Sequence, residues 1–266
     1  MIRKLSSHDL PAAKQLLGEN PAFNLYLLGN LESVGLAADF CEFWGDFAAG
    51  DNRMRAILNR YMSGWALYGR PAADWPGLAA LVDQHPTVAT RLQDNPGGLT
   101  SFLPFLTRYA AEAVHEEELM ALDARDFAPA PPPAGVTVRR ADRRDLADLI
   151  ALYADAGDMQ RSPAGVERPL RDNRIWLAEE GGRIVSAALT NAETAALAMV
   201  GGVHTPPAAR NRGLSQAVCS ALCADLLRGN KQPVLYWRAP AAGAIYRKLG
   251  FKAVGVWRSV WLRLAY

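Results

Sequence analysis

Apolar positions in the second half of the chain alternate between two periods, which predicts a mixed α/β layer. Short apolar runs typical of strands separate segments in which apolar residues recur at helical spacing. A turn through two glycines joins the runs at 175–178 and 184–189 and predicts a hairpin. The expected strands are 136–139, 175–178, 184–189, 195–203, 234–237 and 251–264, and the expected helices are 142–155, 213–228 and 241–249.

The first half of the chain mixes the same two periods in a less regular pattern. The expected helices are 12–17, 23–34, 78–82 and 99–113, and the expected strands are 41–47, 54–58 and 65–68. Both halves open alike, because a short strand precedes an Asp-Leu helix start at Asp9 and again at Asp145. Two related halves are one interpretation, which this likeness alone leaves open.

A proline-rich stretch marks the expected domain boundary. Four of the five residues from Pro129 to Pro133 are prolines, which continue neither a helix nor a sheet ladder. Such a stretch is typical of an extended, semi-rigid spacer. We therefore expect an N-terminal mixed α/β domain at 1–128, a linker at 129–135 and a second domain at 136–266.

Composition narrows the class of protein. Of the 266 residues, 50% are hydrophobic and 21% are charged, which favours a globular fold over a disordered chain. A net charge of +2 is too small for a protein that holds nucleic acid along its length. The longest stretch without a charged residue, 194–209, contains two prolines, so no membrane span is expected. No signal peptide is visible, and the three scattered cysteines and four histidines indicate no metal site, which together favour a cytoplasmic protein.

The segment Val203–Ser215 carries the strongest chemical signal. It leaves an expected strand, turns, and enters the expected helix at 213–228 with the sequence Arg-Asn-Arg-Gly-Leu-Ser. Unpaired N–H groups and the positive end of the helix dipole favour an anion at such a position. Gly213 permits close approach of a ligand, and Arg210 and Arg212 can supply charge-assisted hydrogen bonds. This combination predicts a site for a diphosphate.

These residues resemble the acetyl-CoA motif of the GNAT superfamily of N-acetyltransferases, Gln/Arg-x-x-Gly-x-Gly/Ala, with Ser215 in the last small position. The preceding Gly-Val-His-Thr-Pro-Pro-Ala-Ala-Arg is similar to the Gly-Val-Tyr-Thr-Pro-Pro-x-x-Arg branch of that superfamily, with His204 in place of tyrosine. A second motif, the Tyr-x-x-x-Gly-Phe of the family's late helix, is matched at 244–251. Two motifs in the right order are more specific than either alone.

The resemblance implies a GNAT-like fold from 136 to about 264 and transfer of an acetyl group from acetyl-CoA to a primary amine. The strand at 195–203 should splay from that at 234–237 and leave a slot for pantetheine. Tyr246 is implied as the general acid, and Glu193 is the nearest candidate base, with a water chain as the alternative. The implied cofactor-binding residues are Gly202, Val203, Arg210, Asn211, Arg212, Gly213, Leu214 and Ser215.

Other expectations stay open at this stage. The family's amide side chains before the tyrosine helix are missing here, so a non-catalytic acyl-CoA-binding or regulatory module is the alternative function. The first half is interpreted as a degenerate GNAT-like relative that shapes the acceptor pocket, and the loop 155–171 should contribute to acceptor specificity. Cys219 and Cys223 are expected to be buried on one helix face. The sequence permits a homodimer.

Overall fold

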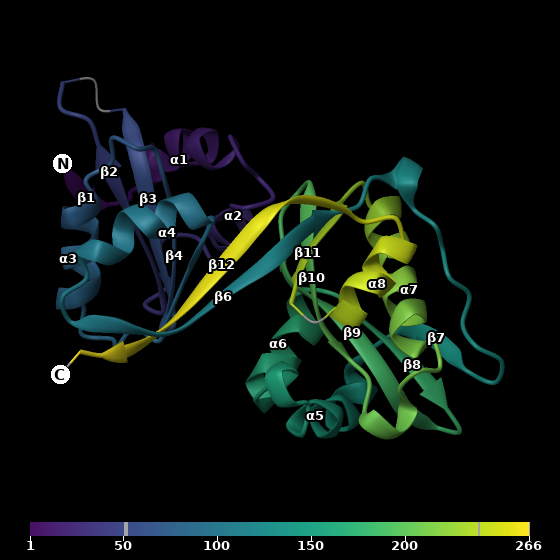
Figure 1. The fold of residues 1–266 in the computed structure, drawn as a ribbon. Coiled ribbons are helices and arrows are strands. Elements are labelled where there is room, and N and C mark those ends of the chain that lie inside the picture. The colour runs from purple at the N-terminus through teal and green to yellow at the C-terminus, as the bar shows by residue number, and fades with distance from the viewer. Residues whose placement is uncertain (51–52, 239, 266) are drawn as a thin grey trace. The chain divides into compact units, whose positions relative to one another are not determined.

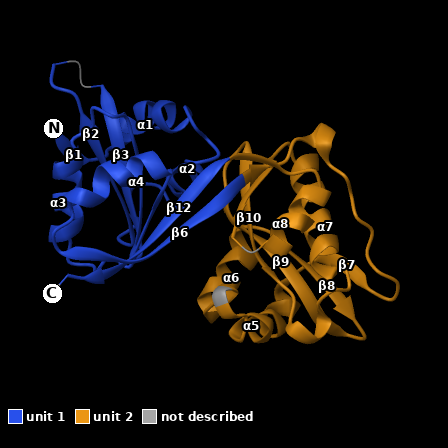
Figure 2. Ribbon diagram, in the orientation of Figure 1, with its two compact units in different colours: residues 1–119, 255–266 blue, residues 120–254 orange. Residues whose placement is uncertain are grey.

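The computed structural model describes residues 1–50, 53–238 and 240–265, which form two compact units (Figure 2). Unit 1 comprises Met1–Leu119 and Gly255–Tyr266, and unit 2 comprises Met120–Val254. In each unit a mixed sheet is flanked by helices (Figure 1), which confirms the expected α/β class.

Unit 2 follows the expected succession of elements with one addition. The addition is helix α6, which lies in the segment expected to be a loop. Ser162 caps it by accepting a hydrogen bond from the Gly165 N–H, and Pro163 occupies its first position. The elements are β7 (Thr137–Arg140), α5 (Leu146–Ala154), α6 (Pro163–Asp172), β8 (Ile175–Glu180), β9 (Arg183–Glu193), β10 (Leu197–His204), α7 (Leu214–Arg228), β11 (Gln232–Trp237) and α8 (Pro240–Lys248). The last strand of the chain, β12 (Lys252–Leu264), lies mostly in unit 1.

The sheet of unit 2 runs in the order β11-β10-β9-β8-β7. Strands β7 to β10 pair antiparallel, whereas β10 and β11 are parallel and are joined by helix α7. A parallel pair requires such a crossover, which brings the helix back over the sheet. The fold thereby places the start of α7 just after the end of β10.

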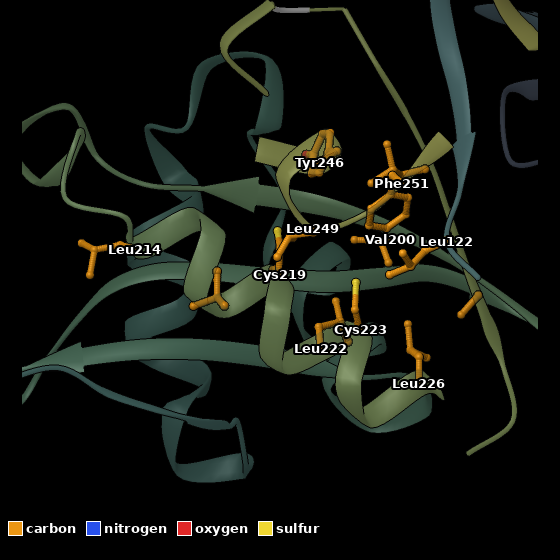
Figure 3. Close-up of a cluster of buried hydrophobic side chains, with 14 of the residues drawn as sticks. Leu122, Val200, Leu214, Cys219, Leu222, Cys223, Leu226, Tyr246, Leu249 and Phe251 are labelled. Atoms are coloured by element: carbon orange, nitrogen blue, oxygen red, sulfur yellow. The ribbon is translucent and has the colours of Figure 1, made fainter. Parts of the chain in front are cut away.

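Helices cover both faces of the unit 2 sheet, and alternate strand residues point to each face. Ala178, Ala188 and Ala198 belong to the core under α7 and α8, which Figure 3 shows with Cys219, Cys223 and Tyr246 inside it. Leu177, Ala187 and Leu189 belong to the core under α5 and α6. Cys219 and Cys223 are fully buried, as expected, and burial raises the pKa of the Cys219 thiol to about 12.

Unit 1 repeats this succession of strands and helices. Its strands β2, β3 and β4 pair antiparallel, and β4 and β5 pair parallel across the crossover helix α3. Its elements are β1 (Ile2–Lys4), α1 (Leu10–Leu17), α2 (Leu25–Ser33), β2 (Cys41–Phe47), β3 (Met54–Tyr61), β4 (Gly64–Gly69), α3 (Trp75–Gln84), β5 (Arg91–Asp94), α4 (Pro96–Phe102) and β6 (Tyr109–Ala121). Each half of the chain thus has the order β-α-α-β-β-β-α-β-α-β, although most of the closing strand β12 lies with unit 1.

The first turn of each unit is built from the same contacts. In unit 1 the Arg3 guanidinium donates two hydrogen bonds to the Asp9 carboxylate, each of 2.7 Å. In unit 2 Arg139 donates to Asp145 at 2.8 and 2.7 Å. Both carboxylates also take part in a capping box. The likeness of the two openings therefore extends from sequence to side-chain geometry and supports two related halves.

Two segments differ from the expectation. Residues 99–113 do not form one helix, since α4 ends at Phe102 and β6 begins at Tyr109. Pro104 interrupts the helix, and pairing within the sheet overrides the weak strand propensity of the glutamates that follow. The proline-rich stretch lies against unit 2, where the Ala130 N–H donates to the Ser220 hydroxyl at 2.9 Å. The compact units divide at 119/120 instead of within that stretch, and residues 255–266 lie with unit 1.

Candidate functional site

Strands β10 and β11 part partway along their length. Their pairing joins Leu197 to Gln232 and ends where Met199 meets Val234. Strand β10 continues to His204 and β11 to Trp237. The second half of β10 thus leaves main-chain groups on the β11 side unpaired by that strand, which is the splay that the sequence predicts.

The same part of β10 is irregular on its other side. Its register with β9 shifts after Met199 and again between Gly201 and His204. Gly202 has a φ of +56°, a left-handed conformation that favours glycine. The buried Tyr153 hydroxyl of α5 donates a hydrogen bond to the Gly202 carbonyl and holds this bulge in place.

Helix α7 begins without a side-chain cap. Gly213 precedes it with a φ of +77°, and no side chain accepts a hydrogen bond from the first turn. Within the described part of the chain, the N–H groups of Leu214, Ser215 and Gln216 have no acceptor. Helices α3, α4 and α6, by contrast, each have an N-cap side chain that accepts such a bond. Free N–H groups at the positive end of a 15-residue helix are the groups that can bind an anion.

The two arginines of the loop before α7 are held differently. Arg212 donates two hydrogen bonds to the Glu180 carboxylate at 3.0 and 2.5 Å, and this pair is exposed. Exposed ion pairs are weak, so a phosphate can compete with Glu180 for the guanidinium. Arg210 donates only through Nε, to the Thr205 carbonyl at 3.0 Å, and its terminal nitrogens lack a partner among the described residues. Asn211 between them has a positive φ of 63°.

A chain of hydroxyl groups fixes the loop between β10 and α7. The Ser186 hydroxyl lies 2.8 Å from that of Thr205, which in turn lies 2.7 Å from that of Ser215. Ser186 also donates to the His204 carbonyl at 3.1 Å. The His204 ring packs against Tyr153, and burial together with the nearby Arg210 lowers the pKa of the imidazole. These contacts tie the loop between β10 and α7 to β9.

Tyr246 lies on α8 and its side chain is 7% exposed. Its ring packs edge-on against Phe251 with the ring centroids 5.9 Å apart, and Figure 3 places it beside α7. Burial, assisted by the two cysteines of α7, raises the pKa of the phenol well above its ordinary value. The phenol therefore stays protonated at neutral pH. Its hydroxyl has no hydrogen-bond partner among the residues that the structure describes.

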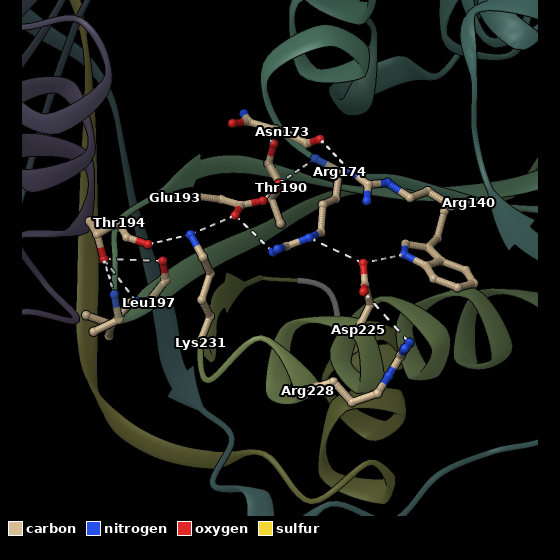
Figure 4. Close-up of polar contacts among 12 residues, drawn as sticks. Arg140, Asn173, Arg174, Thr190, Glu193, Thr194, Leu197, Asp225, Arg228 and Lys231 are labelled. Carbon is tan, nitrogen blue, oxygen red and sulfur yellow. Dashed lines mark hydrogen bonds and ion pairs between the residues drawn. The ribbon is translucent and has the colours of Figure 1, made fainter.

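Glu193 is not brought to these residues. It ends β9 beside Ala198, whereas Gly201 lies beside Leu189, four positions and about 13 Å away along the strand. Its carboxylate accepts hydrogen bonds from Arg174 at 2.9 Å and from Thr190 at 2.8 Å, and forms an ion pair with Lys231 at 3.0 Å (Figure 4). These contacts engage both of its oxygens and favour a role in stability over one as a base.

Replacement of Glu193 by glutamine is therefore expected to lower the free energy of unfolding by roughly 2 kcal/mol, because two partly buried cations lose their counter-charge. Urea unfolding followed by circular dichroism measures this change. The rate of acyl transfer should stay within about threefold of the wild type. A large fall in rate with an unchanged unfolding midpoint would instead restore Glu193 as the base.

Three residues near Gly202 are not identified by the sequence motifs. Tyr153 belongs to the apolar face predicted for its helix, which gives no sign of its hydrogen bond. Arg161 lies in the segment 155–171, for which only a general role in specificity is predicted. Its guanidinium donates to the side chain of Asn191 on β9 at 2.9 Å. Only the packing of α5 and the following loop onto β9 and β10 brings them together.

The described residues show neither a metal centre nor a membrane-spanning helix. Within the described residues, no cluster of three or more His, Cys, Asp or Glu side chains is arranged to hold a metal ion. None of the described helices combines the length and apolar character needed to cross a bilayer.

Comparison with known proteins relates a segment of the chain to one family. The family model for the acetyltransferase (GNAT) domain matches residues 137–254. An uncharacterized N-acetyltransferase encoded in the mutA 5′ region of Streptomyces virginiae is 28% identical over 240 residues, which cover 89% of this chain and 94% of that protein. The sequence resemblance to the superfamily is thereby confirmed.

Solved structures extend the likeness of fold to the whole chain. A GCN5-related N-acetyltransferase from Sphaerobacter thermophilus has a TM-score of 0.67 at 21% identity and covers 99% of this chain and 95% of its own. A tandem GNAT protein from the clavulanic acid biosynthesis pathway has a TM-score of 0.66 at 14% identity, with coverage of 100% and 98%. The fold of both halves, and not that of unit 2 alone, is thus shared with such proteins.

Proposed function

We propose, because its segment 137–254 matches the family model of the GNAT acetyltransferase domain, that this chain moves an acetyl group from acetyl-CoA to a primary amine of a small molecule or an amino acid. The observation that carries the proposal is the start of α7. Its N–H groups have no acceptor among the described residues, and two arginines lie in the loop before it. A diphosphate supplies the acceptors that these groups lack.

The pantetheine arm and the thioester of the cofactor can be placed along β10, next to the start of α7. The diphosphate would bind the N–H groups of Gly213, Leu214 and Ser215 with Arg210 and Arg212 around it. The pantetheine arm would follow the part of β10 that β11 leaves unpaired, near Gly202 and Val203. An extended arm with amide groups can pair with such a strand edge as another strand would. The thioester then lies at the bulge of β10.

Transfer is direct in this proposal. The acceptor ammonium first loses a proton to water, and the free amine attacks the thioester carbonyl. A C–N bond forms, the C–S bond breaks, and the CoA thiolate leaves. The main-chain N–H groups of the bulge stabilise the oxyanion of the intermediate. The Tyr246 phenol, kept protonated by burial, donates a proton to the thiolate. The nitrogen of the new amide loses its second proton, which returns through water to the Tyr246 oxygen, so that the products are the acetylated amine and CoA.

In the described part of unit 1 the corresponding helix start offers no such anion site. Its crossover helix α3 begins with a side-chain cap, because the Asp74 carboxylate accepts a hydrogen bond from the Gly77 N–H at 3.0 Å. The Asp46 carboxylate accepts from the Asp74 N–H at 2.8 Å and is paired with Arg55. Carboxylates of the protein thus engage the groups that a diphosphate would need, and their charge repels it.

We therefore expect one molecule of acetyl-CoA to bind per chain. Titration calorimetry of the purified protein measures this stoichiometry directly. Two equivalent sites per chain would contradict the assignment of the cofactor to unit 2, and no heat of binding with no rise in melting temperature would contradict the proposed function. Desulfo-CoA serves as a non-reactive control ligand with the same diphosphate.

Release of free CoA thiol in the presence of an amine distinguishes an acetyltransferase from a protein that only binds acyl-CoA. A non-catalytic acyl-CoA-binding module would bind acetyl-CoA and release no thiol above the rate without amine. The described cysteines are all buried, so a colorimetric thiol reagent should report CoA with little background from the folded protein.

A further inference from the structure

The guanidinium of Arg161 lies directly against the bulge of β10. A Cβ atom built on Gly202 would come within 3.1 Å of its Nη2 atom. The same nitrogen donates a hydrogen bond to the Asn191 Oδ1 atom at 2.9 Å. The guanidinium also lies over the Tyr153 ring, 5.7 Å from the centroid. Elements on either side of the bulge therefore hold this cation at the place to which the proposed function assigns the thioester.

The charge of Arg161 is not compensated within the described side chains. No described carboxylate lies within ion-pair distance of it, and its Nε atom is buried without a hydrogen-bond partner. A buried donor on a charged group that makes no hydrogen bond costs free energy. The neighbouring arginines of unit 2 at positions 139, 174 and 212 are, by contrast, all paired with carboxylates.

The glycines of the bulge make this arrangement possible. A Cβ atom on Gly201 would lie 2.2 Å from the Asn191 side-chain nitrogen, so only glycine leaves room for that amide. At Gly202 a side chain would meet both Leu189 and Arg161. The two adjacent glycines thus leave room for Arg161 and Asn191 to lie against β10. Larger residues at these two positions would displace both side chains.

From these contacts we propose that Arg161, supported by Asn191, binds the carboxylate of the acceptor, so that the acceptor is an amino acid rather than a simple amine. The inference rests on the proposed function for the position of the thioester. An arginine binds a carboxylate through charge-assisted hydrogen bonds that a neutral group does not replace. In an α-amino acid the amine is two bonds from the carboxylate carbon, so the same contact brings the nucleophile to the bulge.

Matched pairs of acceptors test this inference. The pairs are L-phenylalanine with phenethylamine, L-leucine with isopentylamine, L-histidine with histamine, L-lysine with cadaverine and L-tryptophan with tryptamine. For at least one pair the wild type should release CoA with a kcat/KM about tenfold or more higher for the amino acid. In Arg161→Gln the kcat/KM for that amino acid should fall by about 30-fold or more, and that for the matched amine by less than threefold.

Two further variants separate recognition from folding. Arg171→Gln removes an exposed arginine from α6 whose ion-pair partner among the described residues is its neighbour Asp172. This variant should leave the kcat/KM values for both members of a pair unchanged. Arg161→Lys keeps the charge without the planar fork and should retain part of the preference for the carboxylate. A loss of equal size for both members of a pair, or no preference in the wild type, overturns the inference and leaves acetyl transfer intact.

A binding measurement keeps the inference independent of turnover. Calorimetry with CoA present compares the N-acetyl amino acids with the N-acetyl amines of the same pairs. The inference is supported if a product with a carboxylate binds more tightly than its amine counterpart and if this difference is lost in Arg161→Gln. If the same result were found but no CoA thiol were released, the proposed function would be wrong and the inference about Arg161 would stand. If no carboxylate product binds better than its partner, the inference is wrong.

Discussion

Replacement of Gly213 by valine is expected to lower the affinity for acetyl-CoA by about 100-fold, equivalent to about 2.7 kcal/mol. Gly213 has a φ of +77°, and a β-branched residue there is strained by roughly 1–2 kcal/mol. Relief of that strain would turn the N–H groups at the start of α7 away from the diphosphate. A steric clash is not the cause of the expected loss, because a Cβ atom on Gly213 would lie 4.0 Å from the nearest described atom outside its chain neighbours, the Cγ of Pro133. Titration calorimetry measures the change.

Gly35 supplies a matched control for this substitution. Its φ of +75° is nearly the same, nothing lies within 4 Å of its would-be Cβ atom, and it belongs to unit 1. Gly35→Val should show a similar loss of unfolding free energy and no loss of affinity. Equal affinities in Gly213→Val and the wild type would remove the diphosphate from the start of α7.

Tyr246→Phe is expected to lower kcat by about 100-fold, within the range typical of a general acid, with the affinity for acetyl-CoA unchanged. Phenylalanine keeps the ring that packs on Phe251 and removes only the hydroxyl. Because burial raises the pKa of the phenol, the wild-type rate should show no loss from ionisation of Tyr246 as the pH rises through 9. Steady-state thiol release between pH 7 and 9 measures the change in kcat and the pH dependence of the wild-type rate.

Tyr68 is a suitable control for the loss of a buried phenol. It is 8% exposed, lies on β4 of unit 1, and has its hydroxyl 3.4 Å from the Asn20 amide. Tyr68→Phe should leave kcat unchanged. Were Tyr246→Phe to turn over at the wild-type rate, the proton for the thiolate would have to come from another donor, and the fold and the cofactor site would be unaffected.

Much of the fold follows from local pattern. In the second half of the chain each expected strand and helix exists, because amphipathic periods of 2 and 3.6 residues reflect one buried face of each element. The pattern fails at α6, where two prolines and a glycine hide a capped helix, and at β6, where glutamate-rich residues pair within a sheet. In both places contacts distant in sequence outweigh local propensity.

The candidate site was predictable where it depends on one continuous segment. The loop and first turn at 203–215 carry their chemistry in main-chain N–H groups and two arginines, and a linear motif records both. Tyr246 was identified by a second motif. Glu193 was selected by proximity along the chain, yet the hairpin carries it to the far end of β9 and into an ion-pair network. Adjacency in sequence therefore gave the wrong impression of adjacency in space.

The sequence by itself determined the class of fold, the repeated opening of the two halves and the loop with two arginines before α7, to which we assign the diphosphate. Each of these depends on residues within about one turn or one strand of each other. Only the tertiary structure decided that Arg161, Tyr153 and Asn191 meet at Gly202, and that carboxylates close the equivalent helix start of unit 1. Such contacts depend on the register between strands and on which helix face meets the sheet, and no short segment encodes either.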